Sequence, residues 1–421
     1  MLCGGYFAFR AAHPNPEHSE SAARLQGGRD LLRVSRLTRS TDPGERARGQ
    51  CLRRDYDAWF AEVLARNPGI EPDWLSIPDH QNGFLQWLEF CEAHQVDGEL
   101  GSESLDIPPD IAAIIDGSQP WDADTVAAFL AERSEFLAEV TRIGLLPARS
   151  VAGISIDRWS FVGARFTKQS TDLLLADARL AAEAGDSERA LGRVRAAMGL
   201  AGHYDLVEAP SLLMETVSIL VRLGVQAQTI EHLLPALAPD PASLGAWRDA
   251  LQAPKFEPAA FAKLLRGECW TSLRGLAIPL LADDIDGIDT PEVPDADAFL
   301  DAHAQAYLSA ATTTSTASLA DFLASNDADP WFPPVPPHLS EEAREAYGML
   351  QIGARVWSRG WARAAVLSAR TDAALALLAG EQPPPDPVTG QPFVFDPETR
   401  TLHVPDDPQL RELISEPLKL P

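Results

Sequence analysis

The chain has 421 residues, of which 45% are hydrophobic and 23% are charged, a composition typical of a globular protein. Its 61 acidic and 35 basic residues give a net charge of −26, which repels phosphate backbones and anionic membrane surfaces and so disfavours binding to nucleic acids. The spacings of the four cysteines, Cys3, Cys51, Cys91 and Cys269, fit neither a zinc ribbon nor a disulfide scaffold.

The first nine residues, Met1–Phe9, are apolar. This run is shorter than the roughly 20 residues that span a bilayer, and no basic segment of a signal peptide precedes it. We interpret residues 1–16 as either the end of a membrane anchor that begins upstream or a disordered or docked N-terminus.

Residues 17–106 form the predicted N-terminal helical region. Apolar residues spaced three and four apart predict helices between Glu17 and Asn67, with a break at Asp42-Pro43-Gly44 and an end at Pro68-Gly69. Phe84–His94 carries one apolar face and predicts a further helix.

Residues 107–325 form the predicted central domain. Pro108-Pro109 should open a short helix to Asp116, and Asp122 should cap one helix over Ala123–Ile143. Leu173–His203 predicts two helices joined at Gly185-Asp186, with small residues at the packing positions of a tetratricopeptide unit.

The rest of the central domain shows further helical periodicity, although the Thr312–Ser318 run has poor helix propensity. The predicted helices are Ala209–Leu223, Gln228–Leu237, Ser243–Leu251, Pro258–Leu281 and Asp297–Ala324.

A proline-rich connector over 326–340 precedes the C-terminal region, 341–421. Glu341–Leu378 has the longest helical pattern. Pro392–Phe395 and Thr401–Val404 are β-forming runs that predict a hairpin, and Gln409–Ser415 predicts a short helix. The fold class predicted is therefore mostly α: an irregular helical bundle or solenoid with a tetratricopeptide-like hairpin and a small C-terminal β-hairpin.

Several polar residues stand inside apolar helical patterns. If buried, they must be paired, because an unpaired buried charge is costly. They predict either an internal ion-pair network or a ligand-binding cleft between helical layers, and they are Arg179, His203, Glu215, Arg266 and Glu268.

Arginines recur every fourth residue at Arg355, Arg359 and Arg363, with Trp357 and Trp361 on roughly the opposite helical face. Two interpretations stay open. The arginines form either a solvated face that pairs with acidic neighbours or a docking strip for an anionic partner.

No pattern predicts a metal, a cofactor or a catalytic residue. The acidic run Asp283–Asp289 departs from a calcium loop, because Ala282 and Val293 occupy ligand positions that should be acidic. The common motifs of metalloproteases, serine hydrolases and nucleotide-binding proteins are absent from the sequence.

The helical run Leu175–His203 and the segment Asp386-Pro387-Val388-Thr389-Gly390-Gln391-Pro392 resemble a set of uncharacterised helical bacterial proteins, many of which begin with a membrane anchor. The second segment is also similar to the C-terminal loop of type II secretion pseudopilins, although their N-terminal methylation helix is missing here. The resemblance implies a helical fold and envelope association, and it implies no activity.

We therefore expect a non-enzymatic helical scaffold or protein-interaction module at the bacterial cell envelope, with an unidentified protein partner and a possible membrane tether. The cytoplasm is the alternative location. The alternative function is a hydrolase-type enzyme whose site combines Glu215, Arg266, Glu268 and His203.

Overall fold

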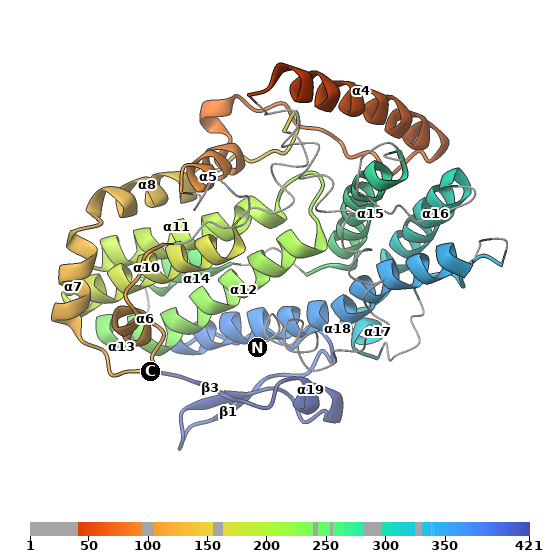
Figure 1. Cartoon of the computed structure of the whole chain (residues 1–421). Coiled ribbons are helices and arrows are strands. Elements are labelled where there is room, and N and C mark those ends of the chain that lie inside the picture. The colour runs from red at the N-terminus through yellow and green to blue at the C-terminus, as the bar shows by residue number, and fades with distance from the viewer. Residues whose placement is uncertain are drawn as a thin grey trace. The chain divides into compact units, whose positions relative to one another are not determined.

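Figure 1 shows the computed structural model. The structure describes residues 41–94, 105–154, 163–238, 243–252, 256–281, 296–324, 331–337, 339 and 341–421, without the side chains at 52, 53, 55, 56, 59, 274–281, 296, 297, 341–343 and 345–356. The predictions for residues 1–40 and for the acidic run at 283–289 lie outside these residues.

The described chain is mostly helical and carries one small antiparallel sheet, so the predicted fold class is confirmed. It divides into two units, each made of separate segments. The first unit combines Met1–Pro68, Trp270–Gln305 and Val335–Tyr347, and the second combines Gly69–Cys269, Ala306–Pro334 and Gly348–Pro421. The continuous regions expected from the sequence remain predictions.

The helices account for most of the described residues. They are α4 (Pro43–Arg66), η2 (Asp79–Gln81), α5 (Gly83–Glu92), α6 (Pro109–Ile115), α7 (Ala123–Ala131), α8 (Ser134–Gly144), α10 (Ala164–Glu183), α11 (Ser187–Asp205), α12 (Leu212–Gln228), η3 (Thr229–Leu233), α13 (Leu234–Leu237), α14 (Leu244–Leu251), α15 (Pro258–Leu281), α16 (Ala296–Thr314), α17 (Leu319–Ala324), α18 (Glu341–Leu378) and α19 (Pro408–Leu413). No helix among the described residues is both long and apolar enough to cross a membrane.

In the first unit, the end of α4 is bound to α16 by polar contacts. Arg66 Nε lies 3.1 Å from a carboxylate oxygen of Asp301. The Asn67 side chain donates to Asp301 at 2.8 Å and accepts from Gln305 at 2.8 Å. These contacts hold together segments more than 230 residues apart in the chain.

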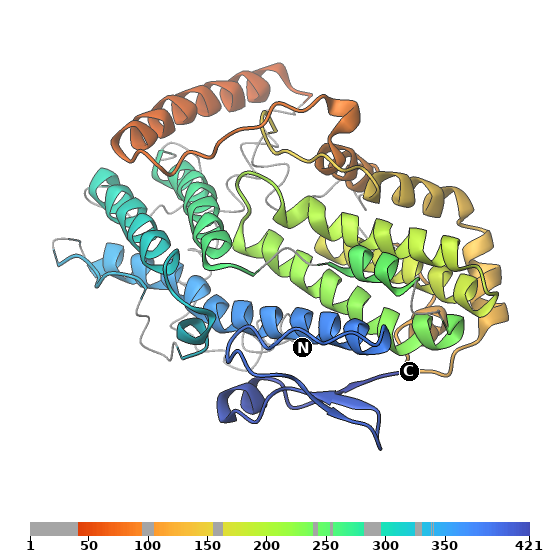
Figure 2. The same cartoon turned by 180° about the vertical axis from the view of Figure 1, so that it is seen from behind.

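In the second unit, α10, α11 and α12 lie side by side (Figures 1 and 2). The predicted hairpin is confirmed: α10 ends at Glu183, Gly185 adopts a positive φ of 77°, and Asp186 caps α11. Ala178 and Ala190 are fully buried, so the two helices of the hairpin pack through small side chains.

The single helix expected over Ala123–Ile143 is wrong, because the chain forms two helices there, α7 and α8. Arg133 leaves helical geometry, with φ −114° and ψ 20°. Its guanidinium covers the Phe129 ring, with Cζ 3.8 Å from the ring centroid, and donates to the Asp106 carbonyl. The predicted cap by Asp122 is confirmed.

Two helices were also expected over 209–237 with a gap between them, but α12 continues directly into the π-helical turn η3 and then α13. Pro235 lacks an amide donor, which interrupts the regular hydrogen-bond ladder. In contrast, the helix expected over Asp297–Ala324 breaks after Thr314, and Ser318 and Asp321 form a reciprocal capping box at the start of α17.

The C-terminal sheet has the order β1-β2-β3 (Val394–Asp396, Thr401–His403 and Leu418–Lys419) and lies beside α18 in both views. The predicted hairpin is confirmed, with Phe395 opposite Leu402; β3 was not predicted. The turns before and within the hairpin share the pattern Asp-Pro-x-Thr. Asp386 and Asp396 each accept hydrogen bonds from the two following backbone amides.

Candidate functional site

A group of buried charges surrounds the connection from α11 to α12. Arg222 on α12 donates two hydrogen bonds to Asp205 at the end of α11, from Nε at 2.9 Å and from Nη2 at 3.0 Å. Both side chains are almost fully buried, and Ser218 accepts a further bond from Arg222 Nε at 3.2 Å. The pair therefore joins the two helices. Because it is buried, solvent and salt screen its charges only weakly from neighbouring charged groups.

Glu215 lies one turn before Ser218 on the same helix and is only 5% exposed. Burial, together with the like charge of Asp205, raises the pKa of its carboxyl to about 8, although Arg222 and Lys263 oppose the shift. No described residue forms a hydrogen bond with this carboxyl. Glu215 is therefore mostly protonated and uncharged at neutral pH.

Three polar side chains around the cluster form hydrogen bonds with backbone groups rather than with one another. Glu208 accepts from the amides of Leu75 and Val151 at 2.9 and 3.0 Å. Lys263 donates to the Val207 carbonyl at 2.6 Å. Glu268 accepts from the Leu212 amide at 2.7 Å, and burial raises the pKa of its carboxyl. These contacts fix the segment that joins α11 to α12.

His203 is fully buried beneath the N-terminus of α5. Its Nε2 lies 3.0 Å from the Ile143 carbonyl, and its Nδ1 has no hydrogen-bond partner. Burial lowers the pKa of the imidazole to about 3, so the ring is neutral. A Cβ at Gly83 would collide with this ring, so glycine is required where α5 crosses α11.

Two of the five predicted site residues lie away from this cluster. Arg266 is exposed on α15. Arg179 is partly exposed, pairs with Glu183 at 3.2 Å and stacks on the Trp121 ring, with Cζ 4.1 Å from the ring centroid. The structure therefore brings only His203, Glu215 and Glu268 to the α11–α12 region.

The outer face of α12 carries leucines instead of charges. Leu213 is 49% exposed and Leu220 is 38% exposed, while Leu223 and Ala227 are partly exposed. The helix contains only two charged residues, Glu215 and Arg222, and both point inward. The helix also buries six apolar side chains, so it is apolar on most of its circumference and its exposed face carries no charge.

One member of the predicted arginine row on α18, Arg359, contacts the C-terminal segment of the same chain, as does Arg370 farther along the helix. Arg359 lies 3.5 Å from Glu412 on α19, and Arg370 donates to the Glu416 carbonyl at 2.6 Å. Burial and the neighbouring Arg363 lower the pKa of Arg370 to about 10. The side chain of Arg355 lies outside the described residues, and the predicted docking strip for an external anionic partner remains a prediction.

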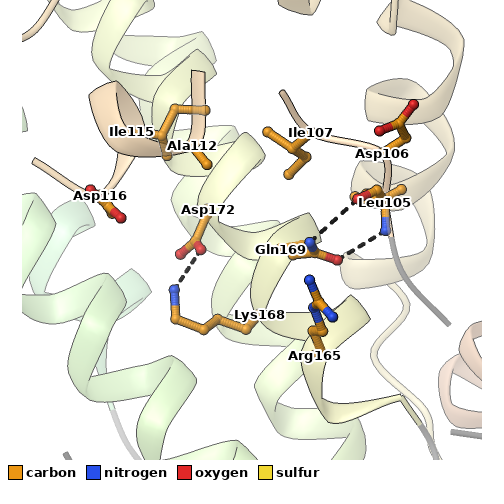
Figure 3. A pocket seen from close by; sticks show the side chains of 10 residues that line it. All are labelled: Leu105, Asp106, Ile107, Ala112, Ile115, Asp116, Arg165, Lys168, Gln169 and Asp172. Carbon is orange, nitrogen blue, oxygen red and sulfur yellow. Dashed lines mark hydrogen bonds and ion pairs between the residues drawn. The ribbon is translucent and has the colours of Figure 1, made fainter. Parts of the chain in front are cut away.

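A pocket of about 470 Å³ lies between α6 and the start of α10 (Figure 3). Lys168 pairs with Asp172 at 2.5 Å, and Gln169 accepts from the Leu105 amide at 2.9 Å. Burial raises the pKa of Asp172, against the effect of Lys168. Arg165 adds one base to the walls, and Asp106 and Asp116 add two acids, so the lining carries charges of both signs with one more acid than base.

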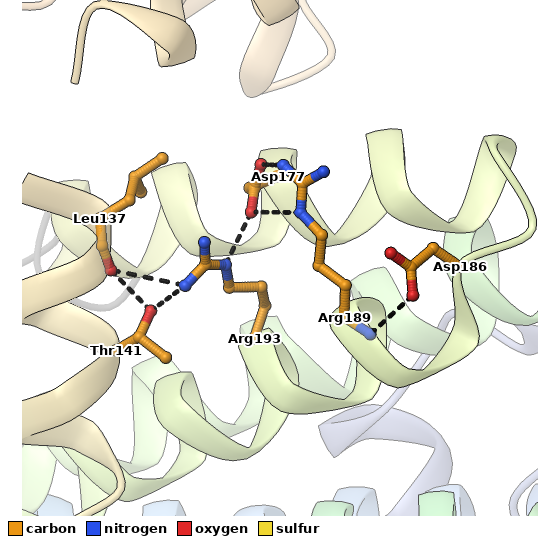
Figure 4. A network of polar contacts seen from close by, with 6 residues as sticks. All are labelled: Leu137, Thr141, Asp177, Asp186, Arg189 and Arg193. Carbon is orange, nitrogen blue, oxygen red and sulfur yellow. Dashed lines mark hydrogen bonds and ion pairs between the residues drawn. The ribbon is translucent and has the colours of Figure 1, made fainter. Parts of the chain in front are cut away.

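Asp177 forms the second buried ionic network (Figure 4). It is 2% exposed and accepts from Arg193 Nε at 2.6 Å and from the guanidinium of Arg189. Arg193 also donates to the Thr141 hydroxyl, so the network joins α8, α10 and α11. Because two arginines compensate the buried Asp177 carboxylate and donate hydrogen bonds to its oxygens, we interpret this network as structural.

The sequence identified Glu215 but did not identify its neighbours Asp205 and Arg222. A signal was present, because Glu215 and Arg222 are seven residues apart and therefore share one face of a helix. Asp177 was missed because a single aspartate inside an apolar run gives no indication of its partners.

Comparison of the chain with family models, curated proteins and solved structures finds no match to any of them.

Proposed function

We propose that this protein is a non-enzymatic helical scaffold that binds another protein through the outer face of α12. The exposed leucines of α12 carry the proposal. Leu213 and Leu220 stay exposed on a face of the helix that carries no charge, so the isolated chain does not gain the free energy of burying them. Contact of the leucines with a partner protein recovers that burial.

Two features of the second unit support this role. The buried Asp205–Arg222 pair and the protonated Glu215 keep charge off the exposed face. The α10–α11 hairpin packs through alanines, as in a tetratricopeptide-like scaffold. The α12 helix packs against this hairpin. Association with the bacterial cell envelope is part of the proposal and rests on the apolar Met1–Phe9 run and on the family resemblance.

The alternative, a hydrolase-type enzyme, has less support from the arrangement of its predicted residues. Arg266 is exposed, the His203 ring is enclosed, and Glu268 is bonded to a backbone amide. A protonated Glu215 has the pKa of a general acid near neutral pH, but a general acid also needs a substrate within hydrogen-bond reach.

Photo-crosslinking in the native host tests the scaffold proposal. A benzophenone side chain placed at Leu220 should form adducts with a protein, because it would lie within the contact. The matched control is Val394, which is 51% exposed on β1. Adducts at position 220 no stronger than those at position 394 would overturn the proposal.

A further inference from the structure

We propose that the pocket between α6 and α10 binds a zwitterionic dipeptide with an aliphatic side chain, its carboxylate on Arg165 and its ammonium group beside Asp172 and Asp116. No residue of α12 lines this pocket, so the proposal is independent of the scaffold function. The order of the charges, their separation and the apolar wall between them support the assignment.

The pocket has a basic end and an acidic end. Arg165, Lys168, Gln169 and Asp172 all line it and share one face of α10, because they are spaced three, four and seven residues apart. Figure 3 shows Arg165 at one end of this face and Asp172 with Asp116 at the other. A ligand with one charge of each sign therefore meets an opposite charge at each end.

Arg165 supplies an anion-binding group at the basic end. Its side chain is exposed and forms no hydrogen bond or ion pair with the part of the chain that the structure describes, Asp106 included. A guanidinium offers parallel N–H donors that match the two oxygens of a carboxylate. A carboxylate is therefore the ligand group expected here.

Two carboxylates and one ammonium group meet at the acidic end. Asp172 pairs with Lys168 at 2.5 Å. Burial raises the pKa of the Asp172 carboxyl, and the like charge of Asp116 acts in the same direction, although Lys168 opposes the shift. This end therefore carries one more negative than positive charge, and an ammonium group of a ligand would be stabilised by both carboxylates.

The separation of the two ends sets the length of the ligand. Seven residues of a helix rise about 10 Å, and the long arginine side chain leans toward the N-terminus, which widens the gap. The charged groups of an extended dipeptide lie about 6–7 Å apart, and a hydrogen bond of about 2.8 Å at each end brings the span to roughly 12 Å. A single α-amino acid carries both charges on one carbon atom, so it reaches only one end.

The wall formed by α6 and the segment before it is apolar. Ile107, Ala112 and Ile115 line the pocket from this side. The Gln169 side chain accepts from the Leu105 amide at 2.9 Å and donates to the Leu105 carbonyl at 3.4 Å, so the segment is held against α10 before a ligand arrives. An aliphatic side chain of the ligand would be buried against this wall.

The size of the pocket agrees with such a ligand. Its volume of about 470 Å³ lies within the range of roughly 300–1,000 Å³ that is usual for small-molecule sites. A zwitterion has no net charge, so the −26 charge of the chain does not repel it as a whole.

Isothermal titration calorimetry on the purified full chain tests the proposal with alanyl-leucine as the probe. Alanyl-leucine should bind in a one-to-one complex. Free leucine lacks the span and 6-aminohexanoate lacks the side chain, so each should bind at least about tenfold more weakly. The absence of alanyl-leucine binding would overturn the proposal, and 6-aminohexanoate binding of equal strength would overturn the assignment of a peptide.

Variants locate the two charged groups of the ligand. Arg165→Ala should weaken alanyl-leucine binding at least about tenfold, and it should remove the preference of the wild type for alanyl-leucine over alanyl-leucine amide, which lacks the carboxylate. The matched control is Arg195→Ala, because Arg195 is exposed on α11 and lies outside the pocket. Equal weakening by both variants, or an Arg165→Ala variant that keeps the full preference, would overturn the assignment of Arg165.

Asp172→Asn tests the acidic end in the same way. It should weaken alanyl-leucine binding and should remove the preference of the wild type for alanyl-leucine over its N-acetyl derivative, which lacks the ammonium group. Circular dichroism checks that the variant is folded. A folded variant that keeps this preference would overturn the placement of the ammonium group.

Discussion

Leu213 and Glu215 are two residues apart on α12, and the leucine is 49% exposed whereas the glutamate is 5% exposed. The helix therefore buries its one acid, while a leucine two residues away stays exposed. Burial and the charges of Asp205, Arg222 and Lys263 all shift the pKa of the Glu215 carboxyl. The contribution of this side chain to the stability of the fold therefore depends on pH.

Glu215→Gln should flatten the pH dependence of stability between about pH 4.5 and 8. The folded-state pKa, about 8, lies above the ordinary value of 4.5, so in this window the folded state holds a proton that the unfolded state has lost. The free energy of unfolding therefore falls as pH rises through the window, by an amount on the order of 1–3 kcal/mol. Glutamine removes that slope.

Urea unfolding at several pH values measures this effect. Glu139→Gln is the control, because Arg142 lowers the pKa of the Glu139 carboxyl below 4.5 and its titration falls outside the window. A wild-type stability that does not decline between pH 5 and 8, beyond what the Glu215→Gln variant shows, would contradict the assignment of a protonated Glu215.

The Asp205–Arg222 pair should show strong coupling in a double-mutant cycle. Asp205→Ala or Arg222→Ala alone leaves a buried charge without its partner and should cost about 3–5 kcal/mol in the free energy of unfolding. The double variant should cost clearly less than the sum. The Lys168–Asp172 pair, whose lysine is 69% exposed, should show coupling of no more than about 0.5 kcal/mol. Additive losses at 205 and 222 would refute the pairing.

Two glycines of α11 should respond in opposite directions to alanine. A Cβ at Gly199 would collide with the Gly144 carbonyl of α8, so Gly199→Ala should destabilise the protein by about 1–3 kcal/mol. A Cβ at Gly192 would meet nothing within 4 Å, so Gly192→Ala should stabilise it by about 0.5–1 kcal/mol. Thermal unfolding of both variants checks the close approach of α8 and α11, which equal shifts would disprove.

The two Asp-Pro-x-Thr turns predict a second matched pair. Gly390 and Arg400 occupy the same position of these turns, with φ of 68° and 53°, a region that costs a non-glycine residue about 1–2 kcal/mol. Arg400→Gly should raise stability by about 0.5–1 kcal/mol, less than that strain because glycine gains freedom on unfolding. Gly390→Ala should lower it by about 1 kcal/mol. Chemical denaturation distinguishes the signs; a loss of stability in Arg400→Gly would contradict the account.

The sequence predicted those elements whose signals are local. The bounds expected for Pro258–Leu281 and Glu341–Leu378 are those of α15 and α18, because both have a continuous apolar pattern. The break at Arg133 was missed, since Arg133 leaves helical geometry where its side chain reaches Asp106, 27 residues away.

The candidate site was only partly predictable for a related reason. Polar residues in apolar helices identified Glu215, but the same rule selected Arg266, which is exposed. Whether a polar residue of a helix points inward depends on which face its neighbours cover, and that is decided by tertiary packing. The burial of Glu215 and the exposure of Leu213 follow from the packing of α12 against α11.

The bond between Asn67 and Asp301 spans 234 residues of chain, and this has a consequence for synthesis. At about 5–20 residues per second, a ribosome needs roughly 10–50 s after α4 has emerged before the partner segment of α16 exists. By then the chain from α5 to α14 is already available to fold. The first unit is therefore completed late, after the Gly69–Cys269 part of the second unit has been synthesised, and α4 must stay soluble until then.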